Sequence, residues 1–317
     1  MLERRAHGVP ARTQEVGRSV IWIDLHVHKN GGTSIRDLMM QLEEAGQLRN
    51  VCTLGRCHIG HYNLTRTVEL MGCSNSTAVE LHEKRFVLKW FLERRAQLQH
   101  THPCSKILLT TRVREPLSFY LSMFRWANIM RRFSNREQQS PNHSSILFHQ
   151  WAPANLQSTM FAFGDFRCFA EGLLWSGKYR YSAFAQKDYA ELAAMLQNDF
   201  DMVFPMDQFD DMLSLIQTQY FGGSEPQTRR VWNRTYHARP RWGTSSSNLD
   251  DTTVAREEAR ICPNMTRCRE HIESIAPFDV RLWALARELA STLSLGRVKV
   301  RRMGDGEARA LHKFTSR

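Results

Sequence analysis

The seven residues HKNGGTS, from His28 to Ser34, place a lysine, two glycines and two hydroxyl side chains between an apolar run and a helical pattern. A glycine pair at such a turn lets the backbone close around an anion, toward which the first N–H groups of the following helix point. Nucleotide-triphosphate loops place their lysine after the glycines, directly before Ser or Thr, whereas here the lysine comes first. A phosphate-binding turn of another kind is therefore predicted. Its residues are Lys29, Asn30, Gly31, Gly32, Thr33 and Ser34.

A second basic segment, TTRVREPLSFYLS, lies well downstream of the first. Arg112 and Arg114 stand at the exit of an apolar run, and Ser118 and Ser122 follow one turn apart on a helix that Pro116 opens. Arginine at a strand end with serine on the following helix suits a second phosphate site. Each segment alone has a simpler interpretation, as a tight turn with a solvated lysine or as a pair of surface arginines. Two such segments in one chain favour anion binding.

Hydrophobic periodicity predicts the elements that position these segments. The apolar runs 19–28 and 106–111 are typical of buried strands, and DMVFP is a third. A helical pattern follows each of them. Strand, turn and helix in alternation predict an α/β fold, a three-layer P-loop-like domain with a central parallel sheet. We expect this domain to span residues 19–296, between a flexible segment at 1–18 and a basic tail at 297–317.

Capping residues mark the ends of the predicted helices. Thr33 or Ser34 is a candidate N-cap for the first helix, and Gly46 is its stop. Asp207 is expected to cap the helix after DMVFP, and a last helix is expected from about Asp279. Inward-facing apolar residues recur at helical spacing. They are Ile35, Leu38, Met39 and Leu42 in the first helix, and Phe209, Met212, Leu213 and Ile216 in the later one.

The composition narrows the class of protein. The chain has 317 residues, 42% of them hydrophobic, which suffices for one large domain. Its formal net charge of +11 favours an anionic partner, such as nucleic acid, an acidic polysaccharide, a membrane surface or a phosphorylated cofactor. No run approaches the roughly 18 apolar residues of a membrane helix. The basic residues are dispersed and no nucleic-acid-binding signature occurs, so nucleic acid is not the expected partner.

Sequons and cysteines indicate a secretory compartment. Five of the twelve asparagines stand in N-glycosylation sequons. They are Asn63, Asn75, Asn142, Asn233 and Asn264. The seven cysteines fit an oxidising lumen, and Cys262 and Cys268 are close enough in sequence to bridge. A zinc site is an alternative for the segment 52–61, which holds two cysteines and two histidines, but no second cysteine pair stands at ligand spacing.

Taken in their order along the chain, the anion-binding motifs resemble those of the Golgi carbohydrate sulfotransferases, especially the heparan sulfate 6-O- and 2-O-sulfotransferase branch. HVHKNGGTS and RVREPLSFYLS are similar to the two cofactor loops of that family. Three later segments, NLQSTMFAFG, VFPMDQFDDMLSLI and APFDVRLWALARE, resemble further family segments in the same order. The match runs from about Ile21 to Leu289. Phe119 departs from the family pattern, which often has a basic residue there.

The resemblance implies a co-substrate, 3′-phosphoadenosine 5′-phosphosulfate, and no metal ion. It assigns the 5′-phosphosulfate of this donor to the turn from Lys29 to Ser34. It assigns the 3′-phosphate to Arg114 and Ser122. As the bond to sulfur breaks, Lys29 would neutralise the negative charge that grows on the departing phosphate.

The same resemblance places the general base in the segment CHIGHYNL. It implies His61, with His58 as the second choice, and neutral imidazole suits the task because it accepts a proton near neutral pH. The implied acceptor is a hydroxyl of a carbohydrate, above all an acidic polysaccharide. The expected location is the Golgi lumen, as the luminal part of a protein whose membrane anchor is not present in this chain.

Two other functions stay open. A P-loop nucleotide kinase or NTPase should show Gly-Lys-Ser/Thr, which the chain lacks, together with a carboxylate for magnesium. A catalytically silent glycan-binding protein on the same fold would keep the basic site but could lose Lys29 or His61. Both residues are present, which favours the enzyme.

Overall fold

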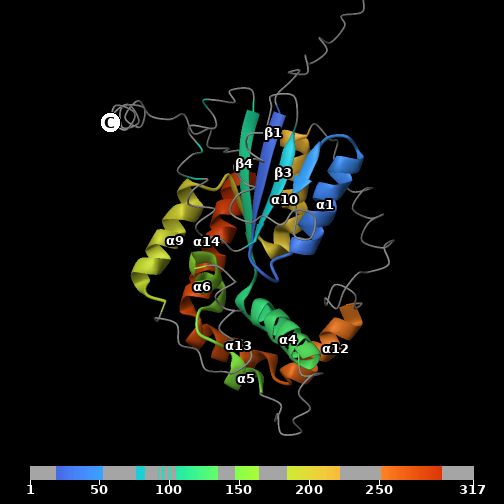
Figure 1. Cartoon of the computed structure of the whole chain (residues 1–317). Coiled ribbons are helices and arrows are strands. Elements are labelled where there is room, and N and C mark those ends of the chain that lie inside the picture. The colour runs from blue at the N-terminus through green and yellow to red at the C-terminus, as the bar shows by residue number, and fades with distance from the viewer. Residues whose placement is uncertain are drawn as a thin grey trace, which may run out of the picture.

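In the computed structural model, the described residues are 19–52, 76–82, 92, 95, 100, 105–134, 147–163, 184–221 and 251–294. Their strands form one parallel sheet in the order β2-β3-β1-β4-β5 (Figure 1). The strands are β1 (Ser19–His26), β2 (Asn50–Cys52), β3 (Thr77–His82), β4 (Ser105–Val113) and β5 (Met202–Pro205). The predicted α/β class with a central parallel sheet is confirmed. The predicted end segments, 1–18 and 297–317, lie outside the described residues.

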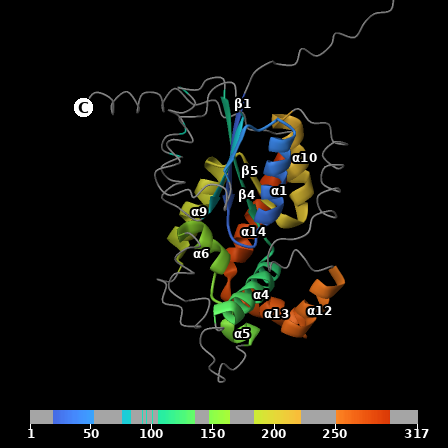
Figure 2. The same ribbon diagram turned by 45° about the vertical axis from the view of Figure 1, so that its right-hand side comes forward.

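Apolar side chains of the sheet alternate between its two faces, as successive residues of a strand must. On β1, Trp22 packs in one core with α1 (Gly32–Glu44) and α10 (Phe209–Tyr220), while Ile21 and Ile23 pack in a second core. Figures 1 and 2 show α1 and α10 on one side of the sheet and α9 on the other. The helices with residues in the second core are α4 (Pro116–Ser134), α5 (Phe148–Trp151), α6 (Leu156–Phe163), α9 (Gln186–Asn198), α13 (Met265–Ile275) and α14 (Pro277–Ser294).

Strand β1 lies at the centre of the sheet and pairs with β3 on one side and β4 on the other. Later strands therefore extend the sheet in both directions from β1. In open parallel sheets, ligands bind at the carboxyl ends of the strands where the strand order reverses in this way. Both predicted anion-binding segments follow strands that end here, β1 and β4. Figure 2 shows α4, α5, α12 (Asp251–Ile261) and α13 gathered beyond this edge of the sheet.

A buried ion pair joins β1 to β4. Arg112 Nη1 and Nη2 donate to the Asp24 carboxylate at 2.6 and 2.9 Å, and neither side chain has exposed surface. Thr110 Oγ1 also donates to Asp24 Oδ1, and Trp22 Nε1 donates to Thr110 Oγ1. A charge can be buried at low cost only when it is paired and hydrogen-bonded. Each member of this pair therefore depends on the other.

The predicted inward faces of the helices are confirmed. All the apolar residues predicted to face inward from α1 and α10 are buried. Helix α4 begins at Pro116 as predicted, and Gly46 follows Ala45, the C-cap of α1, with a φ of 72°. The last helix, α14, begins at Pro277, close to the expected start.

Both predicted N-caps are wrong. Gly31, rather than Thr33 or Ser34, is the N-cap of α1, because its left-handed backbone turns the chain directly into the helix. Asp207 lies inside a short 3-10 turn, η1 (Met206–Gln208), that precedes α10. That extra turn moves the cap of α10 to Gln208.

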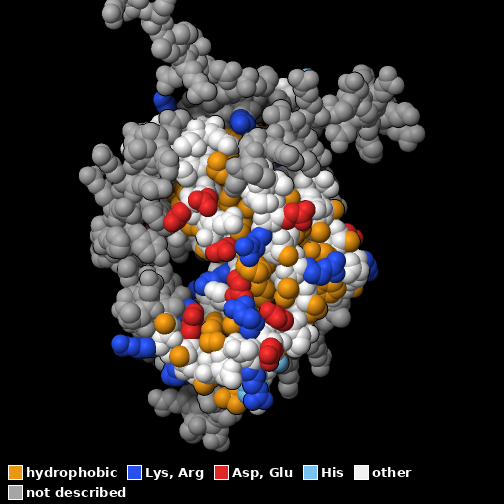
Figure 3. All heavy atoms as spheres, turned by 180° about the vertical axis from the view of Figure 1, so that it is seen from behind, with side chains coloured by type: hydrophobic (Ala, Val, Ile, Leu, Met, Phe, Trp, Pro, Cys, Tyr) orange, Lys and Arg blue, Asp and Glu red, His pale blue; other side chains and the backbone are white. Residues whose placement is uncertain are grey.

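The described surface carries charges of both signs. Figure 3 shows Lys and Arg side chains interspersed with Asp, Glu and apolar side chains on the face that is turned away in Figure 1. None of the described helices is long and apolar enough to cross a membrane. Among the described residues, no three His, Cys, Asp or Glu side chains are grouped to hold a metal ion. Of the cysteines and histidines in the zinc alternative, the structure describes Cys52, which is buried in β2.

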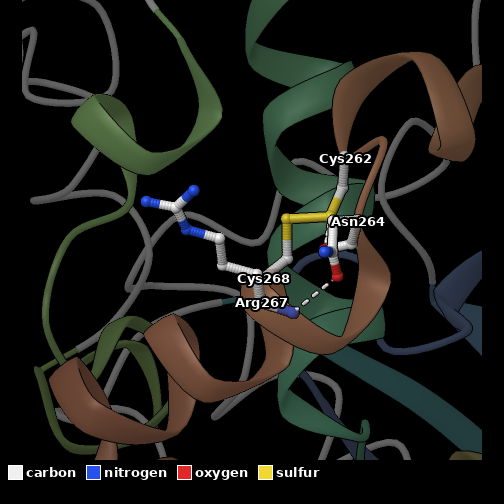
Figure 4. Close-up of a disulfide and its surroundings, with 4 residues drawn as sticks. All are labelled: Cys262, Asn264, Arg267 and Cys268. Atoms are coloured by element: carbon white, nitrogen blue, oxygen red, sulfur yellow. Dashed lines mark hydrogen bonds between the residues drawn. A yellow bond between two sulfur atoms is a disulfide. The ribbon is translucent and has the colours of Figure 1, made fainter.

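A disulfide between Cys262 and Cys268 joins the end of α12 to α13 (Figure 4), as the spacing of the two cysteines allowed. Asn264 lies between them and is the N-cap of α13, because its Oδ1 accepts a hydrogen bond from Arg267 N at 3.0 Å. The Asn264 side chain is exposed, as a glycosylation site must be. The other four sequon asparagines lie outside the described residues.

Substitution of Arg112 by Met tests the buried ion pair. It leaves the Asp24 carboxylate buried without its partner, which should lower the free energy of unfolding by about 3–5 kcal/mol. Urea unfolding measures the loss. The matched control is Arg95→Met, because Arg95 pairs with Asp201 just before the edge strand β5, where both side chains are partly exposed. Losses of equal size in the two variants would contradict a special role for the buried pair.

Candidate anion-binding site

The turn between β1 and α1 contains two residues with left-handed backbone, Lys29 with a φ of 67° and Gly31 with a φ of 75°. This conformation is uncommon for a residue other than glycine and must be held by its surroundings. Asn30 holds it. The Asn30 backbone N donates to Val27 O at 3.1 Å, and Asn30 Nδ2 donates to Arg112 O at 2.9 Å. The turn is thereby fixed to the end of β4.

Gly32 allows α1 to begin against the ring of His26. A Cβ atom on Gly32 would lie 1.7 Å from Cε1 of this ring. The ring cannot move aside freely, because its Nδ1 lies 2.8 Å from Glu80 Oε1. Arg36 holds Glu80 in turn, by donating to both of its carboxylate oxygens. Close packing therefore requires glycine at position 32, whether or not a ligand is bound.

The second predicted segment meets the first at Arg114. From its position just after β4, Arg114 donates from Nη1 to the Lys29 carbonyl oxygen at 3.1 Å and from Nε to Ser118 Oγ at 2.9 Å. Glu115 Oε2 accepts from Ser118 N in the first turn of α4. The two arginines of this segment thus have different roles. Arg112 is held in the buried ion pair, whereas Arg114 lies beside Lys29.

Gln157, which no motif assigned to the site, joins the two turns. Its Oε1 accepts from Arg114 N at 2.8 Å and from Asn30 Nδ2 at 3.0 Å, and its Nε2 donates to Arg114 O at 2.9 Å. The side chain is completely buried on α6. In the sequence, Gln157 is an amide within the mostly apolar helix LQSTMFAF, in a segment that resembles one of the family segments but was assigned no role. That signal does not identify the partners of the amide.

Asp279, on α14, supports the helix that carries Gln157. Its Oδ1 accepts from Ser158 N at 2.7 Å and its Oδ2 from Gln157 N at 3.1 Å, at the start of α6, where negative charge is favourable. Burial raises the pKa of Asp279 from 3.8 to about 6, although hydrogen bonds from Ser158, Gln157 and Tyr120 oppose the shift. The folded protein therefore binds this proton more tightly than the unfolded chain. The stability that this gives is lost as pH rises through about 6.

Three cations gather beside the two turns. Burial, followed by the charges of Arg114 and Arg125, lowers the pKa of Lys29 to about 8. Burial and the charge of Arg125 lower the pKa of Arg114 to about 10, against the opposing charges of Glu258 and Glu115. Like charges this close together disfavour one another's charged form. A bound anion would offset that repulsion.

Ser122 brings a buried hydroxyl to the same region. It lies one helical turn beyond Ser118 on α4, and its Oγ has no hydrogen-bond partner among the described residues. A buried polar atom without a partner is unfavourable and calls for one that the described chain does not supply. The start of α1 adds backbone N–H groups, because its N-cap, Gly31, makes no side-chain cap. Cations, a hydroxyl and helix N–H groups together form a set of donors suited to phosphate oxygens.

The structure brings the two predicted segments together through Lys29 and Arg114. Asn30 was predicted in the phosphate-binding turn, and its side chain fixes that turn to β4 and α6. The remaining residues of the turn lie at the start of α1. They are Gly31, Gly32, Thr33 and Ser34. His61 and His58 lie outside the described residues, so the general base stays a prediction.

No protein-family model matches the chain, and no curated protein matches it either. The resemblance of its motifs to the carbohydrate sulfotransferases therefore stays a prediction. The site itself rests on the fold and on the contacts of the described residues. Those contacts bring cations and helix N–H groups together, which suits an anion.

Gly32→Ala should be coupled in energy to His26→Ala. The added Cβ collides with the His26 ring, and overpacking of this kind costs about 1–3 kcal/mol. Removal of the ring relieves the collision, so the double variant should be more stable than the sum of the single losses predicts, by about 0.5–3 kcal/mol. Chemical unfolding of the single and double variants measures this coupling.

The matched control for that cycle is Gly46→Ala. A Cβ atom on Gly46 would meet no atom within 4 Å, although its φ of +72° also disfavours alanine. The loss of stability in Gly46→Ala and the loss in His26→Ala should therefore simply add in the double variant. If the Gly32 and His26 substitutions were also additive, the collision would not be what requires glycine at this position.

Proposed function

We propose that the protein is an O-sulfotransferase that moves a sulfuryl group from 3′-phosphoadenosine 5′-phosphosulfate to a hydroxyl of a carbohydrate. The contact of Arg114 Nη1 with the Lys29 carbonyl oxygen, at 3.1 Å, supports this proposal most, because it joins two anion-binding turns into one site. A nucleotide with phosphate groups at both its 5′ and 3′ positions matches such a site. The order of the motifs along the chain supports the same assignment.

The two ends of this donor fit different parts of the site. Its 5′-phosphosulfate would lie at the start of α1 beside Lys29, where helix N–H groups favour an anion. Its 3′-phosphate would lie at Arg114 and Ser122, whose hydroxyl has no other partner in the described chain. In this proposal the turn after β1 is P-loop-like, with its lysine before the glycines. The bound donor supplies the sulfuryl group and a phosphate leaving group.

Lys29 has the catalytic role in this proposal. Its ammonium stabilises the negative charge that grows on the leaving oxygen, so its contact is stronger in the transition state than in the ground state. Asn30 and Arg114 hold the backbone of Lys29 in place, which limits the reorganisation needed during the reaction. The proton of the acceptor hydroxyl goes to His61, with His58 as the second choice.

The acceptor class and the compartment are proposed from charge and from cysteine chemistry. The net charge of +11 favours an acidic polysaccharide as the acceptor. The disulfide between Cys262 and Cys268 and the exposed sequon at Asn264 fit the lumen of the secretory pathway. We propose the Golgi lumen, where such acceptors are modified.

Adenosine 3′,5′-bisphosphate tests the assignment of the donor. At a concentration about 100 times its Kd it should stabilise the fold by about 2.7 kcal/mol, because it binds the native state alone. ATP with magnesium should stabilise the protein less. Transfer of label from the sulfate donor to a panel of desulfated polysaccharides then tests the reaction. A larger response to ATP would favour a nucleotide kinase, and donor binding without transfer to any acceptor would favour a silent glycan-binding protein.

Lys29→Ala should mainly lower kcat, because the contact of Lys29 strengthens as the leaving group gains charge. Arg114→Ala should mainly weaken donor binding, by about 1.5–3 kcal/mol for one hydrogen bond to a charged group. Lys187→Ala, at an exposed position on α9, is the matched control and should change neither. Steady-state kinetics with varied donor measures the effects. A rise in KM alone for Lys29→Ala would remove Lys29 from the chemical step.

The pH dependence of kcat/KM tests the same lysine in another way. The pKa of Lys29 is about 8, so its ammonium is lost as pH rises through this value. The pH dependence of kcat/KM reports the ionisation of groups in the free enzyme, so kcat/KM should fall over the same pH range. In Lys29→Arg the cation persists to much higher pH, and the fall should move with it. An unchanged profile in Lys29→Arg would show that another group titrates.

A further inference from the structure

Arg125 lies on the same face of α4 as the two serines of the site. Ser118, Ser122 and Arg125 are spaced by four and three residues, which places them one above another on the helix. Ser118 accepts a hydrogen bond from Arg114 Nε, so this face is turned toward the site. No sequence motif assigned Arg125 to the site.

The Arg125 guanidinium is buried but only partly paired. The residue is 6% exposed, and its Nη2 donates to Glu258 Oε1 of α12 at 3.2 Å. Its Nη1 lies 3.9 Å from Glu257 Oε2, which is too far for a hydrogen bond. Neither Nε nor Nη1 has a hydrogen-bond acceptor among the described residues. Ser122, one turn away, is 1% exposed and likewise has an unpaired Oγ.

These unpaired donors lie near two further cations, Lys29 and Arg114. Arg125 is close enough to lower the pKa of both Lys29 and Arg114. Glu115, one of the nearby carboxylates, already pairs with Arg269. Among the described carboxylates, Glu258 lies closest to Arg125 and accepts a hydrogen bond from one of its three nitrogens, while Glu257 lies 3.9 Å from another. An anion at the free N–H groups would satisfy the buried donors and offset the repulsion together.

We propose that Arg125 is a third cation of the anion site. It binds the 3′-phosphate of the donor together with Ser122, and Glu258 competes with this phosphate for Arg125. The proposal rests on the proposed function, because it names a further residue that contacts the same donor. It also links the site to α12. When the phosphate is bound, Arg125 shares its charge between the ligand and Glu258, so removal of the Glu258 charge should favour the ligand.

Calorimetric titration with two nucleotides tests this proposal. Adenosine 3′,5′-bisphosphate carries the 3′-phosphate, and adenosine 5′-phosphate lacks it. Arg125→Met should weaken binding of the bisphosphate about tenfold or more, the effect of one lost hydrogen bond to a charged group, and should leave the monophosphate nearly unchanged. Glu258→Gln should act in the opposite direction and tighten the bisphosphate several-fold. Arg95→Met, which removes the partner of Asp201 beside the edge strand β5, should alter neither affinity.

The results separate this inference from the proposed function. If the parent protein binds neither nucleotide, the donor assignment is wrong and the inference is wrong with it. If the parent prefers the bisphosphate and Arg125→Met keeps that preference in full, Arg125 does not contact the 3′-phosphate, although the proposed function stands. If Arg125→Met does not fold, Glu258→Gln decides, because it keeps the guanidinium. Tighter binding of the bisphosphate supports the inference, and unchanged binding overturns it.

Discussion

The ion pair between Asp24 and Arg112 is the interaction on which the site depends. It lies between β1 and β4 near their carboxyl ends, and neither side chain has exposed surface. Arg112 Nε donates to the Asn30 carbonyl oxygen at 2.7 Å, and Asn30 Nδ2 donates back to the Arg112 carbonyl oxygen at 2.9 Å. The same arginine therefore joins the two strands and sets the path of the turn. Since either charge is unfavourable without the other, strands and turn are stable only together.

A second layer of buried polar contacts brings in segments that are distant in sequence. Gln157 holds the backbone of Arg114 and the side chain of Asn30, and Asp279 holds the start of the helix that carries Gln157. The contact between Gln157 and Asp279 spans 122 residues. The site is therefore assembled by tertiary packing and does not belong to any one segment. Asp279 is thereby linked to Lys29 through Gln157 and Arg114.

The sequence was sufficient to predict much of what depends on periodicity, although it did not predict β2, β3 or the strand order. Apolar spacing located β1, β4, β5 and the inward faces of α1 and α10, and parallel strands bring the segments after β1 and β4 to one edge. It was insufficient for contacts made by polar side chains at long range. Glutamine and arginine are usually exposed, and only the folded structure shows that Gln157 and Arg125 are buried. The N-caps failed for a related reason, because a local pattern does not reveal a left-handed glycine or an additional 3-10 turn.

Several unfavourable features lie together beside the two turns. Lys29 has left-handed backbone and a lowered pKa, Arg114 has a lowered pKa, and Ser122 has an unpaired hydroxyl. Each of these lowers the stability of the chain alone, and the buried contacts of Arg112 and Gln157 hold them in position. Natural proteins depart from locally favourable structure mainly where function requires it. A bound anion would offset the repulsion between the cations and would accept a hydrogen bond from Ser122, so these features support the proposal of an anionic ligand.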